Sequence, residues 1–188
     1  MALLLLDEDN SHFYQCHPAE DMTVAGLERL VDTYADAMAG TPGALVFCTN
    51  VQRALFASQA WEPLWADYDP DGPDDQPCLR HLAPAARGFQ PGGHRNWVHH
   101  LRLLAERGID HHAVWLARSR ARGLEAWLSV RMNDCHHNPH PDAFWHPSFW
   151  RQHPETHRAA HRDEGWFETA FDYAAPGVAE HHLRLIRE

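Results

Sequence analysis

Lysine is missing from this sequence of 188 residues, and all 16 of its basic residues are arginines. Without lysine the chain cannot form a Schiff base with a carbonyl substrate, and it cannot supply the phosphate-binding lysine of a P-loop. Acidic residues number 26, so the formal net charge is −10 with histidine neutral. Because this charge repels a polyanion, the composition argues against binding of nucleic acid or of an anionic lipid surface.

Long apolar runs and paired cysteines are also missing. No apolar stretch approaches the roughly 20 residues that a membrane helix needs. The apolar run at residues 3–6 is too short for a signal peptide and has no basic residues before it. The four cysteines are scattered and form no CxxC pair, which excludes the usual zinc-knuckle and redox motifs. We therefore expect one soluble domain over residues 1–188, cytoplasmic, with reduced thiols and no membrane contact.

Histidine, by contrast, is unusually abundant, with 17 residues. Free histidine titrates near pH ~6.5, so the net charge is expected to change strongly between about pH 5 and 7. We therefore expect solubility, and any activity, to depend on pH in that range.

Apolar spacing in the first quarter of the chain predicts a βαβ unit. Residues 3–6 and 44–48 are short, continuous apolar runs that end in polar residues, as buried strands of a parallel sheet do. Between them, residues 24–38 have helical spacing, with Asp21 or Thr23 as the N-cap. Each strand therefore delivers polar side chains at its carboxyl end.

A long loop and two further helices separate this unit from the next strand. Residues 67–93 are rich in Asp, Pro and Gly, a composition that does not sustain regular structure. Helical spacing resumes near Trp97 and ends at Gly108, and Asp110 then caps another helix that ends at Gly123.

The third predicted strand, residues 126–132, alternates between apolar and polar side chains. Its apolar face consists of Leu128, Val130 and Met132. We expect that face to pack under helices, whereas the opposite face, with Arg131, should meet a polar interior because a buried unpaired charge is costly. A last helix is expected with Pro176 at its first position.

Three segments carry motifs that occur together in one family. They are LEAWLSVRMNDCH at 124–136, HPSFWRQHPE at 146–155 and FDYAAPGV at 171–178. In this order they resemble the N-terminal part of the bacterial glycoside-hydrolase-like (β/α)8-barrel proteins. The resemblance implies an α/β fold that is partial and TIM-barrel-like, with about three of the eight βα units of a barrel and with long loops.

The resemblance also implies carbohydrate as the ligand, because barrels bind their ligands at the carboxyl ends of the strands. Hydrolysis of a glycoside needs two carboxyl groups, and the candidates for a catalytic role are Asp134, Asp7 and Asp172. Residues expected to contact the sugar are Arg131, Asn133, His136, Asn50 and Trp150. The competing interpretation of the polar residues is structural, as caps of strands and turns.

Four aromatic residues gather in the segment after the third strand, namely Phe144, Trp145, Phe149 and Trp150. A flat aromatic ring can stack on a sugar. Long loops, however, usually have aromatic clusters beneath them that anchor them to the domain. We favour the anchoring role for most of the four and expect Trp150 to be the exposed one.

Histidines 153, 157 and 161 recur every four residues. If Pro154 opens a helix, His153, His157 and His161 share one face, and two of them could bind zinc or nickel. No HExxH motif is present, however, and the spacing fixes no third ligand. Adjacent histidines, such as those at 136 and 137, cannot both face one ion from a regular helix or strand. We therefore expect no cofactor, with zinc or nickel as the alternative.

Three functional hypotheses stay open. The first is a glycoside-hydrolase-like protein that binds carbohydrate and, in its catalytic version, hydrolyses glycosidic bonds. The second is a non-catalytic carbohydrate-binding or assembly piece whose incomplete barrel is completed by further copies of the chain, because free sheet edges aggregate unless they are covered. The third is a metal-dependent hydrolase that uses the His-rich loop.

Overall fold

The computed structural model describes residues 3–9, 11–38, 40–158 and 169–188. Within these residues, three strands form one parallel sheet in the order β1–β2–β3. The strands are β1 (Leu4–Glu8), β2 (Gly43–Cys48) and β3 (Glu125–Ser129). The register places Leu6 beside Leu45, and Leu45 beside Ala126. This confirms the α/β class and the three parallel strands predicted from the apolar runs.

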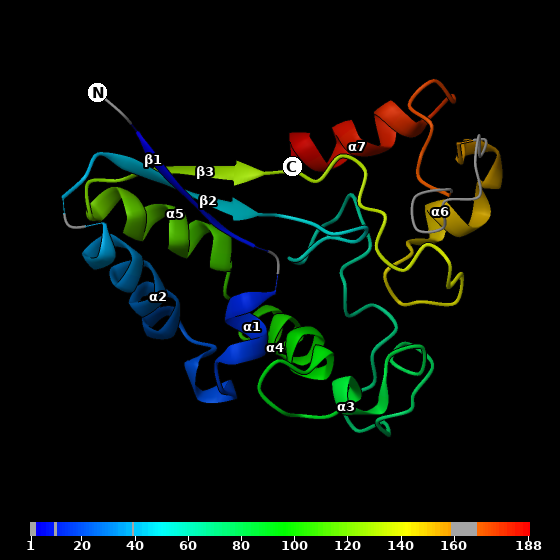
Figure 1. The fold of residues 1–188 in the computed structure, drawn as a ribbon, viewed down its shortest axis with the longest axis horizontal. Coiled ribbons are helices and arrows are strands. Elements are labelled where there is room, and N and C mark those ends of the chain that lie inside the picture. Colours follow the sequence, from blue (N-terminus) through cyan, green and yellow to red (C-terminus); the bar gives the residue numbers. More distant parts are fainter. Residues whose placement is uncertain (1–2, 10, 39, 159–168) are drawn as a thin grey trace.

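Helices connect the strands and follow the last one (Figure 1). The connection between β1 and β2 contains α1 (His12–Cys16), a 3-10 turn at Ala19–Asp21, and α2 (Val24–Ala37). Between β2 and β3 lie α3 (Pro84–Arg87), α4 (His94–Glu106) and α5 (His111–Ala121). After β3 come α6 (Ser148–Gln152), a 3-10 turn at Pro154–Thr156, and α7 (Val178–Arg187). Among the described residues, no helix combines the length and the apolar character needed to cross a membrane.

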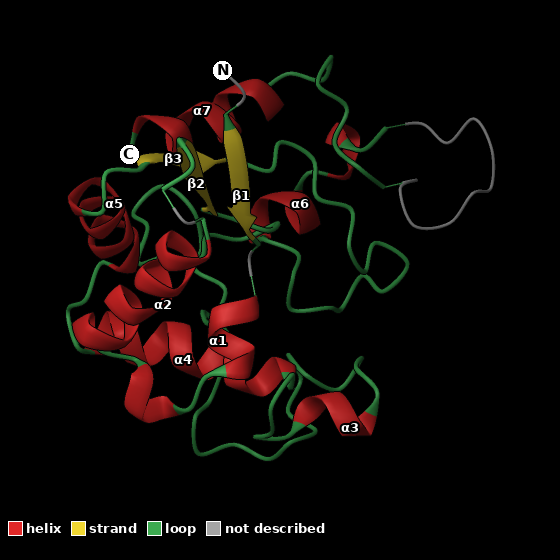
Figure 2. Ribbon diagram, turned by 60° about the vertical axis from the view of Figure 1, so that its left-hand side comes forward, coloured by secondary structure: helices red, strands yellow, loops and turns green. Residues whose placement is uncertain are grey.

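One face of the sheet is covered by helices and the other is open. Figures 1 and 2 show α2 and α5 on the same side of the strands. On that side Leu45 and Phe47 enter the main apolar core, and Phe47 stacks on Trp115 of α5 with 5.0 Å between ring centroids. On the other side, which we call the open face, Leu5 and Trp127 are 52% and 42% exposed.

The predicted helix caps are confirmed. Thr23 precedes α2, and its side chain accepts a hydrogen bond from the backbone N–H of Gly26 at 3.1 Å. Asp110 precedes α5 and accepts from the backbone N–H of Ala113 at 2.9 Å. Each cap satisfies an N–H group that has no partner inside its helix, and so fixes where the helix begins.

Several predicted boundaries are wrong. The helix predicted from Pro176 begins at Val178. Gly177 has a left-handed φ of 90°, so a regular helix cannot include Pro176 and Gly177. The predicted loop over 67–93 contains the single turn of α3. The strand predicted to end at residue 132 ends at Ser129, because the backbone N–H and oxygen of Arg131 bond to the side chain of Asn50 rather than to a neighbouring strand.

The apolar side of β3 does not pack under helices as predicted. Leu128 lies on the helix-covered side of the sheet but is about half exposed, and Met132 is also exposed. Only Val130 of this set packs against a core cluster, beside Trp61 and Leu185. The reason is that β3 is the edge strand of the described sheet, and α7 packs on the segment after β2 rather than along β3.

Candidate functional site

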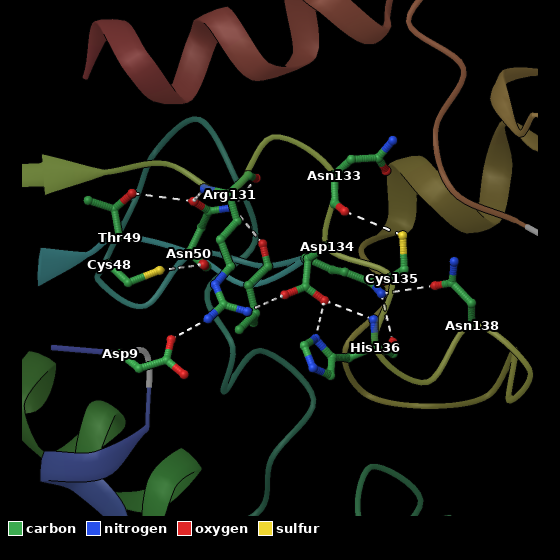
Figure 3. A network of polar contacts seen from close by, with 12 residues as sticks. Asp9, Cys48, Thr49, Asn50, Arg131, Asn133, Asp134, Cys135, His136 and Asn138 are labelled. Carbon is green, nitrogen blue, oxygen red and sulfur yellow. Dashed lines mark hydrogen bonds and ion pairs between the residues drawn. The ribbon is translucent and has the colours of Figure 1, made fainter. Parts of the chain in front are cut away.

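The carboxyl ends of the three strands bring together polar residues that are far apart in the sequence (Figure 3). Asp9 follows β1, Asn50 follows β2, and Arg131, Asp134 and His136 follow β3. Because the strands are parallel, their carboxyl ends lie at one edge of the sheet. Of the residues predicted from the sequence for this edge, Arg131, Asp134, His136 and Asn50 lie here.

Asn50 is a buried clamp between the ends of β2 and β3. Its side-chain amide donates to the backbone oxygen of Arg131, and its side-chain oxygen accepts from the backbone N–H of Arg131, both at 2.9 Å. The backbone N–H of Thr49 adds a bond to the oxygen of Ser129 at 3.0 Å. Asn50 is fully buried, so its observed role is to position Arg131.

Arg131 links the ends of β1 and β3. Its guanidinium forms an ion pair with Asp9 and donates to Asp134 Oδ2 at 3.1 Å. Both the guanidinium and the Asp9 carboxylate remain partly exposed, so they can also contact a ligand. The predicted polar environment of Arg131 is thus supplied by two carboxylates.

Asp134 and His136 form a carboxylate–imidazole pair. Asp134 Oδ1 accepts from the backbone N–H of His136 at 2.9 Å and from its ring Nδ1 at 2.8 Å. Burial acts to raise the pKa of Asp134, but the bonds from His136 and the charge of Arg131 lower it below its usual value. In turn, the bond to Asp134 raises the pKa of His136. This arrangement fixes the imidazole, and in the neutral ring it leaves Nε2 as the basic nitrogen.

A cavity of about 420 Å³ opens beside this network. Its wall includes Asp9, Arg131, His136, His137, Trp97 and Trp145. Charged and hydrogen-bonding groups therefore occupy one part of the wall and aromatic rings another, as in many small-molecule sites. A smaller cavity of about 260 Å³ near Phe56 is lined mainly by apolar residues and includes none of the predicted site residues that the structure describes.

The other predicted polar residues have structural contacts. Asn133 donates to the backbone oxygen of Phe171 at 2.9 Å and accepts from its N–H at 3.1 Å, which fastens the segment before α7. Asp172 accepts from the backbone N–H of Ala174 at 2.9 Å and closes a turn. Asp7 points to the open face, in register with Val46. Neither Asp7 nor Asp172 belongs to the described wall of the cavity.

The prediction that Trp150 is exposed is wrong. Trp150 is 7% exposed, and its ring lies between two imidazoles, His146 at 3.9 Å and His157 at 4.4 Å between centroids. Its indole N–H donates to the backbone oxygen of Thr169 at 2.9 Å. Trp150 therefore anchors the segment and cannot stack on a sugar. Trp145 is also largely buried, in agreement with the anchoring role, although part of it reaches the cavity wall.

The predicted histidine face for a metal does not form in the described residues. Pro154–Thr156 is a 3-10 turn, and His157 has extended backbone, so His153 and His157 do not share a helical face. His157 Nε2 contacts the backbone oxygen of Trp150 at 3.0 Å, and His153 Nδ1 donates to Glu155 at 2.9 Å. His161 lies outside the described residues. Within them, no group of three or more His, Cys, Asp or Glu side chains is arranged to hold a metal ion.

His137 was not predicted as a site residue. It has a left-handed φ of 60°, the one positive φ among the described non-glycine residues. Adjacent side chains of a regular strand point in opposite directions, whereas this conformation lets His136 and His137 line the same cavity. No local sequence signal identifies such a position, although histidine is one of the residue types enriched in this conformation.

No protein-family model matches the sequence, and no curated protein matches it. Functional inference therefore depends on the geometry of the site.

Proposed function

We propose that this protein is a glycoside-hydrolase-like protein of partial (β/α)-barrel type that binds carbohydrate in the cavity at the carboxyl ends of its strands. The observation that supports this most strongly is the cavity wall, where the partly exposed side chains of Asp9, Arg131 and His136 lie together. Sugars present hydroxyl groups around their edges, and a carboxylate, a guanidinium and an imidazole can all form hydrogen bonds with them. Trp97 and Trp145 are 2% and 4% exposed, so they form the floor of the cavity rather than a stacking surface.

The arrangement of the sheet supports the barrel part of the proposal. Strands β1, β2 and β3 are neighbours in sequence order, and α2 and α5 cover the same face. A doubly wound fold reverses its strand order at a switch point and covers both faces with helices. A barrel keeps the order and places its helices outside. In this interpretation, the open face of the sheet corresponds to the interior of the barrel.

Calorimetric titration tests the proposed ligand class. We expect at least one member of a panel of soluble gluco-, xylo-, galacto- and chito-oligosaccharides to bind, and Asp9→Asn to weaken that binding by at least tenfold. Asp9 is the most exposed carboxylate of the network, so its loss removes a contact with sugar hydroxyls. The matched control is Asp142→Asn, because Asp142 is 82% exposed and lies outside the cavity wall. Failure of every oligosaccharide to bind, or equal binding by Asp9→Asn, would overturn the proposal.

Catalysis is supported by one observation, the pair of Asp134 and His136. A buried carboxylate that orients an imidazole is the usual arrangement of a general base. Because its pKa is lowered, Asp134 stays ionised at neutral pH, and with its side chain 1% exposed and both oxygens bonded to His136 and Arg131 it suits the role of orienting the imidazole. We expect slow release of nitrophenol from an aryl glycoside of the bound sugar, and loss of that release in His136→Gln. Sugar binding without any release would instead favour the non-catalytic hypothesis.

We also infer that further copies of this chain cover the open face. Leu5 and Trp127 are apolar and exposed there, and the outer edges of β1 and β3 have no partner strand among the described residues. Such edges and faces promote association. Light scattering should give a defined oligomer for the wild type and a monomer for Trp127→Lys. A wild-type monomer at all concentrations would contradict this inference.

A further inference from the structure

Five imidazoles gather in and around the wall of the cavity. This histidine cluster consists of His81, His94, His137, His140 and His146. Its members come from three segments, namely the loop before α3, the first turn of α4 and the segment after β3. The cluster therefore joins parts of the chain that no regular secondary structure connects.

Ring contacts hold the cluster together. His137 lies parallel to Trp145 with 5.2 Å between centroids, and His94 meets the same indole edge to face at 5.8 Å. The edge of His81 meets His137 at 5.0 Å, and His140 lies 6.3 Å from His137. Residue His137, which lines the cavity, is thus held in place by aromatic neighbours rather than by a regular backbone ladder.

Most of the cluster has few hydrogen bonds that would stabilise a charge. Neither ring nitrogen of His81 has a hydrogen-bond partner in the described part of the chain, and the same is true of Nδ1 of His94. His146 is the exception, because its Nε2 lies 3.3 Å and 3.2 Å from the backbone oxygens of His137 and His140, and its Nδ1 lies 2.5 Å from Oε1 of Gln52. The unpaired nitrogens of His81 and His94 favour neutral rings, whereas the oxygens around His146 favour a protonated one.

The electrostatic surroundings also favour the neutral form. Burial, followed by the proximity of the other imidazoles, lowers the pKa of His81 and of His137 to about 4. Burial lowers the pKa of His146 to about 4 as well, although its bonds to the backbone of His137 and His140 act in the opposite direction. Asp134 acts on His137 in the opposite direction, and burial alone lowers the pKa of His94.

We propose that protonation of the histidine cluster opens the cavity by separating residues 135–140 from His81 and Trp145, while the sheet and helices α2 and α5 stay folded. Charged imidazoles about 5–6 Å apart repel each other in a partly buried site. This repulsion acts on the ring contacts of His137, and it opposes the bonds that Gln52 donates to the backbone oxygen of His136 and to Asn138 Oδ1, at 2.8 Å and 3.0 Å. An opened segment exposes His137 and His81 to water, where a free imidazole titrates near pH ~6.5. Because the open form then binds more protons, acidification below that pH favours it.

The consequence for the site rests on the proposed function, since an open segment removes His136 and His137 from the sugar-binding wall. Carbohydrate binding should then weaken in acid for two reasons, protonation of His136 and opening of the segment, and so by more than protonation of His136 alone causes. The opening itself requires no ligand, so it can be measured on the protein alone.

Hydrogen–deuterium exchange measures the opening directly. After correction for the intrinsic pH dependence, we expect amides of residues 135–140 to exchange at least tenfold faster at pH 4.5 than at pH 6.5. Amides of β2 and α2 should remain protected over the same range. His81→Phe should move the midpoint of the opening to lower pH, because a phenylalanine can pack beside Phe144 as His81 does, at 5.5 Å, and cannot be charged.

A matched control and a second variant make the test decisive. His99→Phe changes a histidine of α4 outside the cluster and should leave the midpoint unchanged. His137→Asn removes one imidazole of the cluster but keeps a residue that tolerates the left-handed backbone, so it should act in the same direction as His81→Phe. An exchange rate of 135–140 that does not depend on pH would overturn the proposal. The proposal would also be overturned if amides of β2 lost protection at the same pH as those of 135–140, or if neither His81→Phe nor His137→Asn moved the midpoint.

Discussion

At the scale of single residues, the site is defined by contacts between segments that lie far apart in the chain. Asn50 and Arg131 are predicted from the sequence at the ends of neighbouring strands, and the structure brings them together there. The sequence does not reveal that Asn50 bonds to the backbone of a residue 81 positions later rather than to a ligand. A polar residue after a strand is compatible with both roles, and only the tertiary arrangement decides between them.

Loss of the Asn50 clamp should destabilise the protein. Asn50→Leu leaves the backbone N–H and oxygen of Arg131 without these partners in a buried position, so we expect a loss of about 2 kcal/mol in the free energy of unfolding. Chemical denaturation measures this loss. Asn96→Ala is the comparison, since Asn96 makes one bond to the backbone oxygen of Gln90 near the surface and should cost less than about 1 kcal/mol. Equal effects of the two variants would contradict the assigned role.

The pairing of His136 with Asp134 should be visible in the titration of His136. In the wild type we expect the pKa of His136 to lie above ~6.5, the value of a free imidazole, because the carboxylate stabilises the charged ring. Asp134→Asn should lower the pKa of His136, since a neutral amide cannot stabilise the charged ring in the same way. NMR titration of the ring C–H signals gives both values. A His136 pKa that does not respond to Asp134→Asn would show that the pair does not form in solution.

At the scale of secondary-structure elements, local signals were sufficient for some parts and insufficient for others. The cap at Thr23 and the apolar spacing after it predicted α2, and Asp110 predicted the start of α5. The helix expected from Pro154 became a 3-10 turn, because the segment instead packs Trp150 between two imidazoles. The outcome there depends on packing partners, which spacing within the segment does not reveal.

Helix α2 offers a test in which packing opposes helix propensity. Alanine is favoured over glycine in a helix by about 1 kcal/mol, but a Cβ at Gly26 would lie 1.9 Å from the backbone oxygen of Asp21. We therefore expect Gly26→Ala to lower the melting temperature, in spite of propensity. Ala25→Gly, at an exposed neighbouring position, should cost only about 1 kcal/mol through propensity. A rise in melting temperature for Gly26→Ala would contradict the close approach of these two segments.

At the scale of the whole molecule, fewer histidines gain a charge between pH 7 and 5 than the composition predicts. Eleven of the described histidines have a lowered pKa and stay neutral when the protein is folded, chiefly because they are buried. They are His81, His94, His99, His100, His111, His112, His137, His146, His157, His181 and His182. The charge of the folded protein therefore changes less between pH 7 and 5 than the 17 histidines alone predict. Burial cannot be read from composition, which explains the difference.

Stability should fall in acid as a result. The folded-state pKa of each buried histidine lies below its unfolded value of ~6.5, so the unfolded chain binds more protons below that pH. The raised pKa values of His136 and of the buried Glu8 act in the opposite direction, but these are two groups against eleven. We expect the melting temperature to decrease steadily from pH 7 to pH 5. His111→Phe should reduce this dependence, because His111 is fully buried and its pKa is well below normal. A melting temperature that is constant over this range would contradict the burial of the histidines.

The central claim, that carbohydrate binds at the carboxyl ends of the strands, is tested most directly by NMR of the histidine rings during titration with oligosaccharides. We predict saturable shifts of the His136 and His137 signals, because both residues line the cavity. The signal of His182, which bonds to the backbone of Val178 within α7, should stay unchanged. No shift with any oligosaccharide, or a shift of His182 without one of His136 and His137, would contradict the assignment of this cavity as a carbohydrate site.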